Sequence, residues 1–209
     1  MLSHKLLLKA GYISQLSAGI FSFTPMGWRV VNNIKKVINE EMENINCLEA
    51  NLPVIQPSSI WEQSGRIDSF IPPLANFYDR RDKTMIIAPT HEEAVIELVK
   101  NNLKSFRDLP FSIFHIQPKF RDETRPRGGL LRVREFEMKD AYSFHQDEKS
   151  LDEEFDKFSE AYFKIFNRCG INVVKVAADS GAIGGKVSSE FISVSDSGED
   201  TILICESCN

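Results

Sequence analysis

Two strand-like segments of the chain, residues 112–123 and 130–144, carry arginines, carboxylates and an aromatic ring at alternating positions. The residues between them are rich in arginine and glycine, as in a loop, so the two segments predict a long antiparallel hairpin. Side chains alternate between the two faces of a strand. One face should therefore collect Arg121 and Glu123 from the first arm and Arg132, Arg134, Phe136, Met138 and Asp140 from the second.

These residue types together suit the binding of a nucleotide. A guanidinium group binds phosphate through two hydrogen bonds, and a carboxylate can accept a hydrogen bond from an adenine amino group. An aromatic ring can stack on the purine. The alternative from composition alone is an exposed hairpin covered by a ladder of mixed charges.

The elements that position the hairpin are predicted from hydrophobic periodicity and from turn residues. One element is expected over residues 4–18, helices over residues 28–45, 90–103 and 150–169, and a short helix over a capping box at Ser59–Glu62 that ends near Gly65. Short strands are expected over residues 20–23, 52–55, 77–78, 84–88, 171–178 and 188–194. No repeat or linker divides this pattern, which predicts one α+β unit with an antiparallel sheet flanked by helices.

The composition is that of an ordinary globular protein, with 42% hydrophobic and 26% charged residues. The formal net charge of −5 excludes a global positive field, so any contact with RNA has to be local and DNA is not an expected partner. No apolar run approaches the roughly 20 residues of a membrane-spanning helix, and the first residues do not form a secretion signal. We therefore expect a cytoplasmic protein that does not bind a membrane.

The cysteines and histidines do not predict a metal site. The chain has four cysteines, and although Cys205 and Cys208 have the spacing of half a zinc site, two further ligands are missing. We expect reduced thiols. No special role is expected for His91, and His115 and His145 are expected to be ordinary hydrogen-bonded residues.

The hairpin resembles a known motif. Residues 120–123 read Phe-Arg-Asp-Glu and are followed after a loop by Arg132 and Phe136, which is similar to motif 2 of the class II aminoacyl-tRNA synthetases. The run from Phe120 to His145 resembles bacterial-type prolyl-tRNA synthetases in particular. Blocks at residues 3–11, 25–30 and 88–93, and the pairs Gly184-Gly185 and Glu190-Phe191, are also similar to that family, in the same order.

The resemblance implies a role for each nucleotide-site residue. Arg121 would bridge the α-phosphate of ATP and the carboxylate of the amino acid, where negative charge develops during activation. Glu123 would meet the adenine amino group and Phe136 would stack on the ring. Arg132 would reach the outer phosphates, with Mg²⁺ neutralising the rest.

Thr90 and Glu92 match a T-x-E loop that, in the family, receives the secondary ammonium group of proline. An alternative for Thr90 is a capping box with Glu93, which would not involve Glu92. Bacterial relatives usually have a histidine where this chain has Ser189, so one wall of the expected proline pocket differs.

The resemblance also implies partners. The loop over residues 124–131, with Arg125 and Arg127, would contact the acceptor end of tRNA(Pro), although its arginines could equally be solvated loop charges. Pro53 and the helix over residues 28–45 resemble motif 1, which forms a homodimer interface in this class. An apolar helix face of this kind is more often part of the intramolecular core.

We therefore expect a proline–tRNA ligase with a class II catalytic fold that is incomplete, because the third motif is absent. Residues 1–195 would be the front part of the catalytic domain and residues 196–209 the start of an editing insertion, so this chain alone is expected to be weak or inactive. One alternative is a truncated, non-catalytic paralogue that binds an aminoacyl-type ligand or a partner protein. A synthetase for threonine or serine is disfavoured by residues 89–92 and 140–144.

Overall fold

A three-stranded sheet lies at the centre of the molecule. The computed structural model describes residues 1–180, 186–195, 198 and 201–203. The sheet has the order β3-β7-β8, with β3 (Leu48–Glu49) parallel to β7 (Phe111–Phe120) and β8 (Glu135–Phe144) antiparallel to it. The register runs from Phe111 opposite Phe144 to Phe120 opposite Glu135, which confirms the predicted hairpin.

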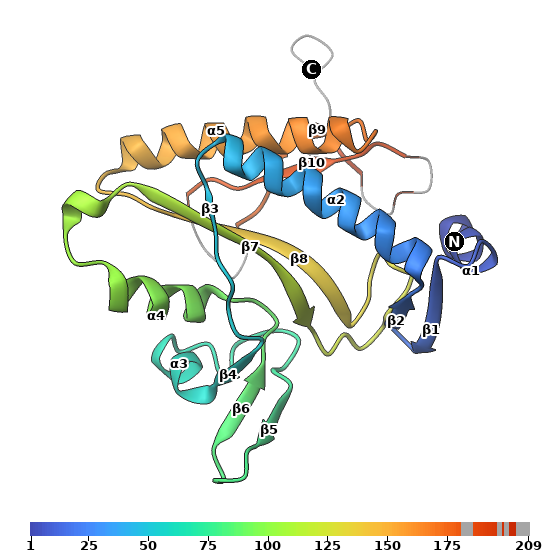
Figure 1. Cartoon of the computed structure of the whole chain (residues 1–209), viewed down its shortest axis with the longest axis horizontal. Helices are drawn as coiled ribbons and strands as arrows, with labels where there is room; N and C mark the ends of the chain where they lie inside the picture. The colour runs from blue at the N-terminus through green and yellow to red at the C-terminus, as the bar shows by residue number, and fades with distance from the viewer. Residues whose placement is uncertain (181–185, 196–197, 199–200, 204–209) are drawn as a thin grey trace.

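Helices cover both faces of this hairpin (Figure 1). Helices α2 (Pro25–Asn44) and α5 (Glu148–Arg168) lie side by side on one face, and α4 (Glu92–Asn102) lies against the other. Even-numbered residues of β7 and odd-numbered residues of β8 point toward α5, and the remaining residues point toward α4. We call these surfaces the α5 face and the α4 face.

The α5 face is the main hydrophobic core. Phe114 is buried there by α2 and α5, in a cluster with Met42, Cys47, Ala161 and Ile165. The helices that supply this cluster begin at side-chain caps, since Thr24 accepts from the Gly27 amide and Asp147 from the Ser150 amide. Burying side chains of this size stabilises the fold by about 1.5–3 kcal/mol each. The predicted amphipathic helices over residues 28–45 and 150–169 are confirmed as α2 and α5.

The α4 face is apolar at one end only. Ile113 packs with Leu52 and Val95 near the end of the hairpin where β7 begins and β8 ends, and Val99, Phe111, Tyr142 and Phe144 extend this cluster. Farther along the strands, the same face presents His115, Lys119 and Asp140, all buried. Buried polar side chains are uncommon in a protein interior, so this end of the α4 face is a candidate for a functional role.

Smaller elements surround the sheet. A second sheet has the order β4-β6-β5, from β4 (Ile55–Pro57), β6 (Thr84–Ile87) and β5 (Asn76–Tyr78), with α3 (Ser58–Gln63) beside it. Near the N-terminus, α1 (Leu2–Lys9) precedes the hairpin of β1 (Ile13–Ser17) and β2 (Ile20–Phe23). The remaining elements are η1 (Phe106–Asp108), β9 (Val174–Ala177) and β10 (Ser189–Ile192). Among the described residues, no helix is long and apolar enough to cross a membrane.

Three local predictions are wrong. The single element expected over residues 4–18 is divided in two: α1 ends at Lys9, because Gly11 adopts a left-handed φ of 69°, and residues 13–17 pair with β2. The capping box at Ser59 does not form, since α3 begins at Ser58 with Pro57 at the N-cap and no side-chain cap. The strand expected over residues 52–55 begins only at Ile55, after Pro53.

Candidate active site

A cleft opens at the loop end of the hairpin and collects the predicted nucleotide residues. Its volume is about 480 Å³, and its lining includes Arg121, Glu123, Arg132 and Phe136 together with Leu130, Leu131, Val133 and Glu137. The structure therefore brings all four predicted ATP-site residues to one cavity, two from each arm of the hairpin.

Arg121 connects this cleft to the loop before α4. Its Nε donates a hydrogen bond of 3.2 Å to the carbonyl oxygen of Pro89, the residue before Thr90. Its guanidinium group also lies over the ring of Phe136, with the carbon 5.5 Å from the ring centroid. The guanidinium group of Arg121 thus lies between the residues predicted to bind the nucleotide and the loop that carries Thr90.

Glu123 and Arg132 face each other across the cleft. Arg132 Nε donates to Glu123 Oε2 at 2.8 Å, and the Arg125 amide donates to Oε1 of the same carboxylate at 3.2 Å. The hydrogen bond from Arg132, followed by that from Arg125, holds the pKa of Glu123 below its ordinary value. The carboxylate is therefore charged at neutral pH and keeps Arg132 directed toward the cleft.

Arg134 does not share this cleft, and the prediction that it does is wrong. Its guanidinium donates to Asp122 and lies over the ring of Phe120, 5.3 Å from the ring centroid. Its amide donates to the carbonyl of Gly19 at 2.8 Å. Residue 134 lies before the first residue of β8, and although its carbonyl accepts from the Arg121 amide at 2.8 Å, its side chain lies with Asp122 and Phe120, so the strict alternation of the strand does not extend to it.

Thr90 and Glu92 form a polar pair beside Arg121. The buried Thr90 hydroxyl donates to Glu92 Oε2 at 2.5 Å. Arg66 Nη1 lies 3.5 Å from the same Glu92 oxygen. The oxygens of Thr90 and Glu92 can bind a cation, and the guanidinium group of the neighbouring Arg121 can bind an anion.

The alternative role of Thr90 in a capping box is wrong. The N-cap of α4 is His91, and it makes no side-chain cap bond. Glu93 is instead buried, with Arg66 Nη1 at 2.9 Å and the Ser64 hydroxyl at 3.0 Å from its Oε1. Arg66 is a site residue that the sequence did not reveal, because nothing in its local spacing connects it to residues far along the chain.

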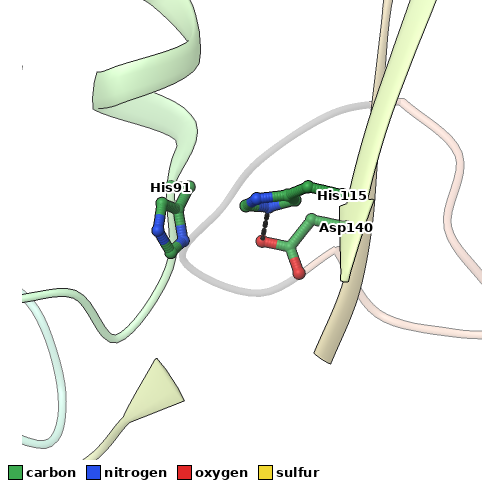
Figure 2. A group of neighbouring side chains, drawn as sticks. All are labelled: His91, His115 and Asp140. Carbon is green, nitrogen blue, oxygen red and sulfur yellow. Dashed lines mark ion pairs between the residues drawn. The ribbon is translucent and has the colours of Figure 1, made fainter. Parts of the chain in front are cut away.

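A buried charged cluster lies behind Thr90 on the α4 face, and its grouping was also missed. Lys119 Nζ is 3.2 Å from Asp140 Oδ2 and 3.4 Å from His115 Nε2, and His115 Nε2 is 3.2 Å from the same carboxylate oxygen. Figure 2 shows the ring of His91 facing the edge of the His115 ring, with a centroid separation of 4.6 Å. Tyr142 donates to Asp140 Oδ2 at 3.0 Å.

Burial and neighbouring charges shift the pKa values of this cluster. Burial, reinforced by the charge of Lys119, lowers the pKa of His91 from 6.5 to about 4. Burial alone would raise the pKa of Asp140, but the hydrogen bond to His115 and the charge of Lys119 hold it below its ordinary value. Burial lowers the pKa of Lys119, and Asp140 opposes that shift. The ground state therefore combines a neutral His91 with an ionised Asp140.

The loop over residues 124–131 packs against the N-terminal hairpin. Arg127 and Arg132 exchange backbone hydrogen bonds of 3.0 and 3.1 Å, and the Arg125 side chain is exposed. A Cβ atom at Gly19 would lie 2.7 Å from Pro126, and one at Gly129 would lie 2.7 Å from His4. The loop is therefore held by close glycine contacts, with Arg125 left facing solvent.

Other predicted residues lie elsewhere. Ser189 lines an apolar cavity of about 240 Å³ that also contains Ala141 and Ser143, so it lies on the α5 face and the prediction that it walls the Thr90 site is wrong. The reason is the pairing of β10 with β9 beside α5, which the local sequence does not specify. His115 and His145 are hydrogen-bonded as expected, to Gln117 and Ser150. Gly184, Gly185, Cys205 and Cys208 lie outside the described residues.

The apolar stripe of α2 divides between two environments. Met42 is buried, and Ile38 and Ile45 pack against it in the core, as the intramolecular alternative predicts. Val30 and Ile34, nearer the start of the helix, remain 44% and 43% exposed. Among the described residues, only the second half of the predicted apolar face is packed into the core.

Comparison with known proteins places this geometry in a family context. Residues 75–208 match the tRNA synthetase class II core domain (G, H, P, S and T). The chain is 49% identical over 208 residues to the proline–tRNA ligase of Dehalococcoides mccartyi. This alignment covers 100% of this chain and 37% of the relative. It is 53% identical over 205 residues to the proline–tRNA ligase of Staphylococcus haemolyticus, covering 98% and 36%. The chain thus spans little more than a third of these relatives.

Solved structures with a similar fold agree. Prolyl-tRNA synthetase from Cryptosporidium parvum, complexed with L-proline and AMP, superposes with a TM-score of 0.77 at 20% identity, over 90% of this chain and 39% of that one. Prolyl-tRNA synthetase from Giardia lamblia, in complex with prolyl-adenylate, gives a TM-score of 0.76 at 21% identity, over 83% and 37%. At this level of identity the likeness establishes the fold.

Proposed function

We propose, from the premise that this chain belongs to the class II tRNA synthetase core-domain family and has its catalytic fold, that the protein activates proline with ATP and transfers it to tRNA(Pro). The observation that carries the proposal is the position of Arg121. It lines the nucleotide-sized cleft and also contacts the loop that presents Thr90 and Glu92.

In the proposed reaction, a carboxylate oxygen of proline attacks the α-phosphorus of ATP. A bond forms between that oxygen and phosphorus, the bond to the bridging oxygen breaks, and pyrophosphate leaves with the electron pair. Negative charge grows on the α-phosphate oxygens, and Arg121 would stabilise it without losing its own charge. The protein forms no covalent intermediate, so its contribution is positioning and electrostatics.

Thr90 and Glu92 would bind the secondary ammonium group of proline. The Glu92 carboxylate and the Thr90 hydroxyl oxygen are adjacent, and both can accept hydrogen bonds from the two N–H groups of proline. With Arg121 on the carboxylate side, this would fix both ends of a small imino acid next to the α-phosphate.

ATP would occupy the cleft between the hairpin arms. Glu123 would accept from the adenine amino group, Phe136 would stack on the purine, and Arg132 would bind the outer phosphates. Because Arg121 covers one face of the Phe136 ring, we propose that Arg121 rotates toward the α-phosphate as the purine takes its place.

Mg²⁺ would accompany the triphosphate. The two carboxylates that line the cleft are already paired, Glu123 with Arg132 and Glu137 with Lys35 at 2.9 Å. This described part of the chain therefore offers the ion no unpaired carboxylate, and phosphate and water oxygens would supply its ligands. When bound, the ion would neutralise phosphate charge.

The tRNA and dimer assignments follow from the same family membership. The exposed Arg125, with Arg127, would contact the phosphates of the tRNA acceptor end. The exposed residues Val30 and Ile34 at the start of α2 would be covered by a second copy of the chain. Residues 1–195 would be the front of the catalytic domain, with an inserted domain starting at residue 196.

The test is proline-dependent exchange of pyrophosphate into ATP, catalysed by the full-length natural protein that contains this chain. Threonine and serine are tested as alternative substrates. We expect exchange with proline and about 100-fold less with the other two, because a pocket built for the ring of proline would leave their hydroxyl group without a hydrogen-bond partner. Equal exchange with threonine or serine would contradict the proposal. We expect this chain alone to exchange weakly or not at all.

A further inference from the structure

Arg66 contacts two adjacent carboxylates at the start of α4, and the function proposed above uses only one of them. Arg66 Nη1 lies 2.9 Å from Glu93 Oε1 and 3.5 Å from Glu92 Oε2. The side chain of Glu93 is 2% exposed, whereas that of Glu92 is 38% exposed. The ammonium group of the proposed substrate would bind Glu92, which leaves the buried pair of Arg66 and Glu93 without a role in that function.

The guanidinium group of Arg66 is held in place by two aromatic rings. Its carbon lies 5.6 Å from the centroid of the Trp61 ring and 5.3 Å from that of Phe70, and the two rings meet edge to face. Trp61 is fully buried, and its indole nitrogen donates to Gln56 Oε1 at 2.9 Å. The guanidinium group can therefore shift between the two carboxylates, but it cannot turn away from them without losing these contacts.

Glu93 is the main partner of Arg66. A buried carboxylate is costly without a donor, and Glu93 Oε1 has both Arg66 Nη1 and the Ser64 hydroxyl, at 2.9 and 3.0 Å. Glu92 is more exposed to solvent, and its close hydrogen bond comes from the Thr90 hydroxyl, which carries no charge. One positive charge is thus shared unequally between two negative charges, and the remaining negative charge lies mainly on Glu92.

A second arginine of the protein makes a structural contact of the same type. Arg168 at the end of α5 also contacts two adjacent glutamates, Glu40 and Glu41 of α2, whose side chains are 40% and 9% exposed. Each of these carboxylates has a guanidinium nitrogen of its own, since Nη1 lies 2.6 Å from Glu41 and Nη2 donates to Glu40. Both carboxylates are therefore paired. At Arg66, by contrast, Nη1 contacts both carboxylates, and the exposed one has the longer contact.

We propose that Glu93 is a positioning residue: by holding Arg66, it keeps the charge of the Glu92 carboxylate available to the ammonium group of the substrate. Without Glu93, the guanidinium group moves toward Glu92 by less than about 1 Å, reaches the distance of a charge-assisted hydrogen bond and competes with the ligand. The inference rests on the proposed function, because it concerns the affinity of the same site for its amino acid.

The experiment changes which carboxylate holds Arg66. Glu93→Leu removes the buried partner and leaves the guanidinium group beside Glu92. Combining Glu93→Leu with Arg66→Met removes both charges, and the replacement of a buried ion pair by apolar side chains is often tolerated. Glu41→Leu is the matched control, because it removes the less exposed carboxylate of the Arg168 contact between α2 and α5.

Pyrophosphate exchange by the full-length natural protein that contains this chain gives kcat and the KM values for L-proline and ATP. We expect Glu93→Leu to raise the KM for proline about fivefold to tenfold, between the effects of an exposed ion pair and of a hydrogen bond to a charged group. The KM for ATP and kcat should stay within about twofold, because the guanidinium group competes only with the bound ammonium group.

The double variant should return the KM for proline to within about threefold of the wild-type value. A structural role does not predict this reversal, since the loss of a further contact would then add to the damage. Glu41→Leu should leave both KM values within about twofold, whatever urea unfolding shows for its stability. A double variant with a KM for proline as high as that of Glu93→Leu would overturn the inference, and so would equal rises for proline and ATP.

If Glu93→Leu does not fold, Glu93→Gln removes the charge while keeping the shape of the side chain. It should give a smaller rise in the KM for proline, and an unchanged KM would contradict the inference. If the wild-type protein is inert toward proline, the proposed function fails and the inference fails with it. If the wild type is active and the Glu93 variants bind proline as well as it does, the inference alone fails.

Discussion

The two faces of the β7–β8 hairpin bury a lysine each, and the two lysines have different surroundings. Lys119 on the α4 face has the Asp140 carboxylate at 3.2 Å. Lys139 on the α5 face contacts the Tyr162 hydroxyl, and burial lowers its pKa from 10.5 to about 8. Burial lowers the pKa of both lysines, but the Asp140 carboxylate opposes that shift at Lys119, whereas Lys139 has a neutral hydroxyl as its hydrogen-bond partner.

The faces also differ in what they contribute to the molecule. The α5 face supplies apolar contacts around Phe114 and Met42, which stabilise the fold. On the α4 face, the buried side chains of His115, Lys119 and Asp140 take the place of apolar residues, and they lie on the side of the candidate substrate residues. Substitutions on the two faces should therefore separate stability from substrate handling.

The largest effect is expected from Arg121→Ala. Removing the guanidinium from the cleft should lower kcat/KM for proline activation about 10³-fold, as loss of a transition-state donor does, with little change in the free energy of unfolding. Pyrophosphate exchange and urea unfolding measure the two quantities. Arg121→Lys keeps the charge without the planar fork and should recover only part of the activity. If Arg121→Ala lowered kcat/KM less than tenfold, Arg121 would not take part in the reaction.

On the other face, Phe114→Ala should lower the free energy of unfolding by about 3–5 kcal/mol, because a fully buried ring is replaced by a cavity. Urea unfolding measures the loss, with Phe114→Leu as a milder control. The KM for proline of the folded protein should remain unchanged. A selective rise in that constant would show that the two faces are coupled.

The α4 face should also give stability a pH dependence of its own. The unfolded chain protonates His91 below pH 6.5, whereas the folded chain does so only near pH 4, so the unfolded state binds more protons between these values. Stability should fall by roughly 3 kcal/mol as the pH decreases through this window. Urea unfolding from pH 7 to 4 measures it, and His91→Gln should flatten the slope. An identical slope in the variant would contradict the assignment.

The smallest effect is expected at the rim of the cleft. Arg132 is half exposed, so breaking its ion pair with Glu123 should change stability little. Arg132→Gln should nevertheless raise the KM for ATP about fivefold to tenfold, the effect of losing one typical hydrogen bond at an exposed position, and leave the KM for proline unchanged. A rise for proline alone would reverse the assignment of the two subsites.

The regular elements could be predicted because their signals are local. The alternation of residues in β7 and β8 predicted the hairpin, and apolar residues at three- and four-residue steps predicted α2 and α5. The same signals predicted one continuous element over residues 4–18, whereas one glycine with positive φ ends the helix and the residues after it pair with β2. Local propensity is weaker than the hydrogen bonds of a ladder.

The candidate site could be predicted only in part. Arg121, Glu123, Arg132 and Phe136 follow from strand alternation and from the motif, and the structure brings them to one cleft. Arg66 and Ser189 could not be placed in this way. Their neighbours come from distant elements, since Arg66 pairs with Glu92 and Glu93 while Ser189 lies beside Ala141 on the opposite face.

Within β7 and β8, the sequence by itself determined which side chains share a face of the hairpin, because the two-residue period of a strand is a property of the backbone. Only the tertiary structure decided which helix covers each face, and hence that Lys119 meets Asp140 and His115 whereas Lys139 meets Tyr162. The reason is that these contacts depend on packing between segments far apart in the chain, which no local spacing encodes.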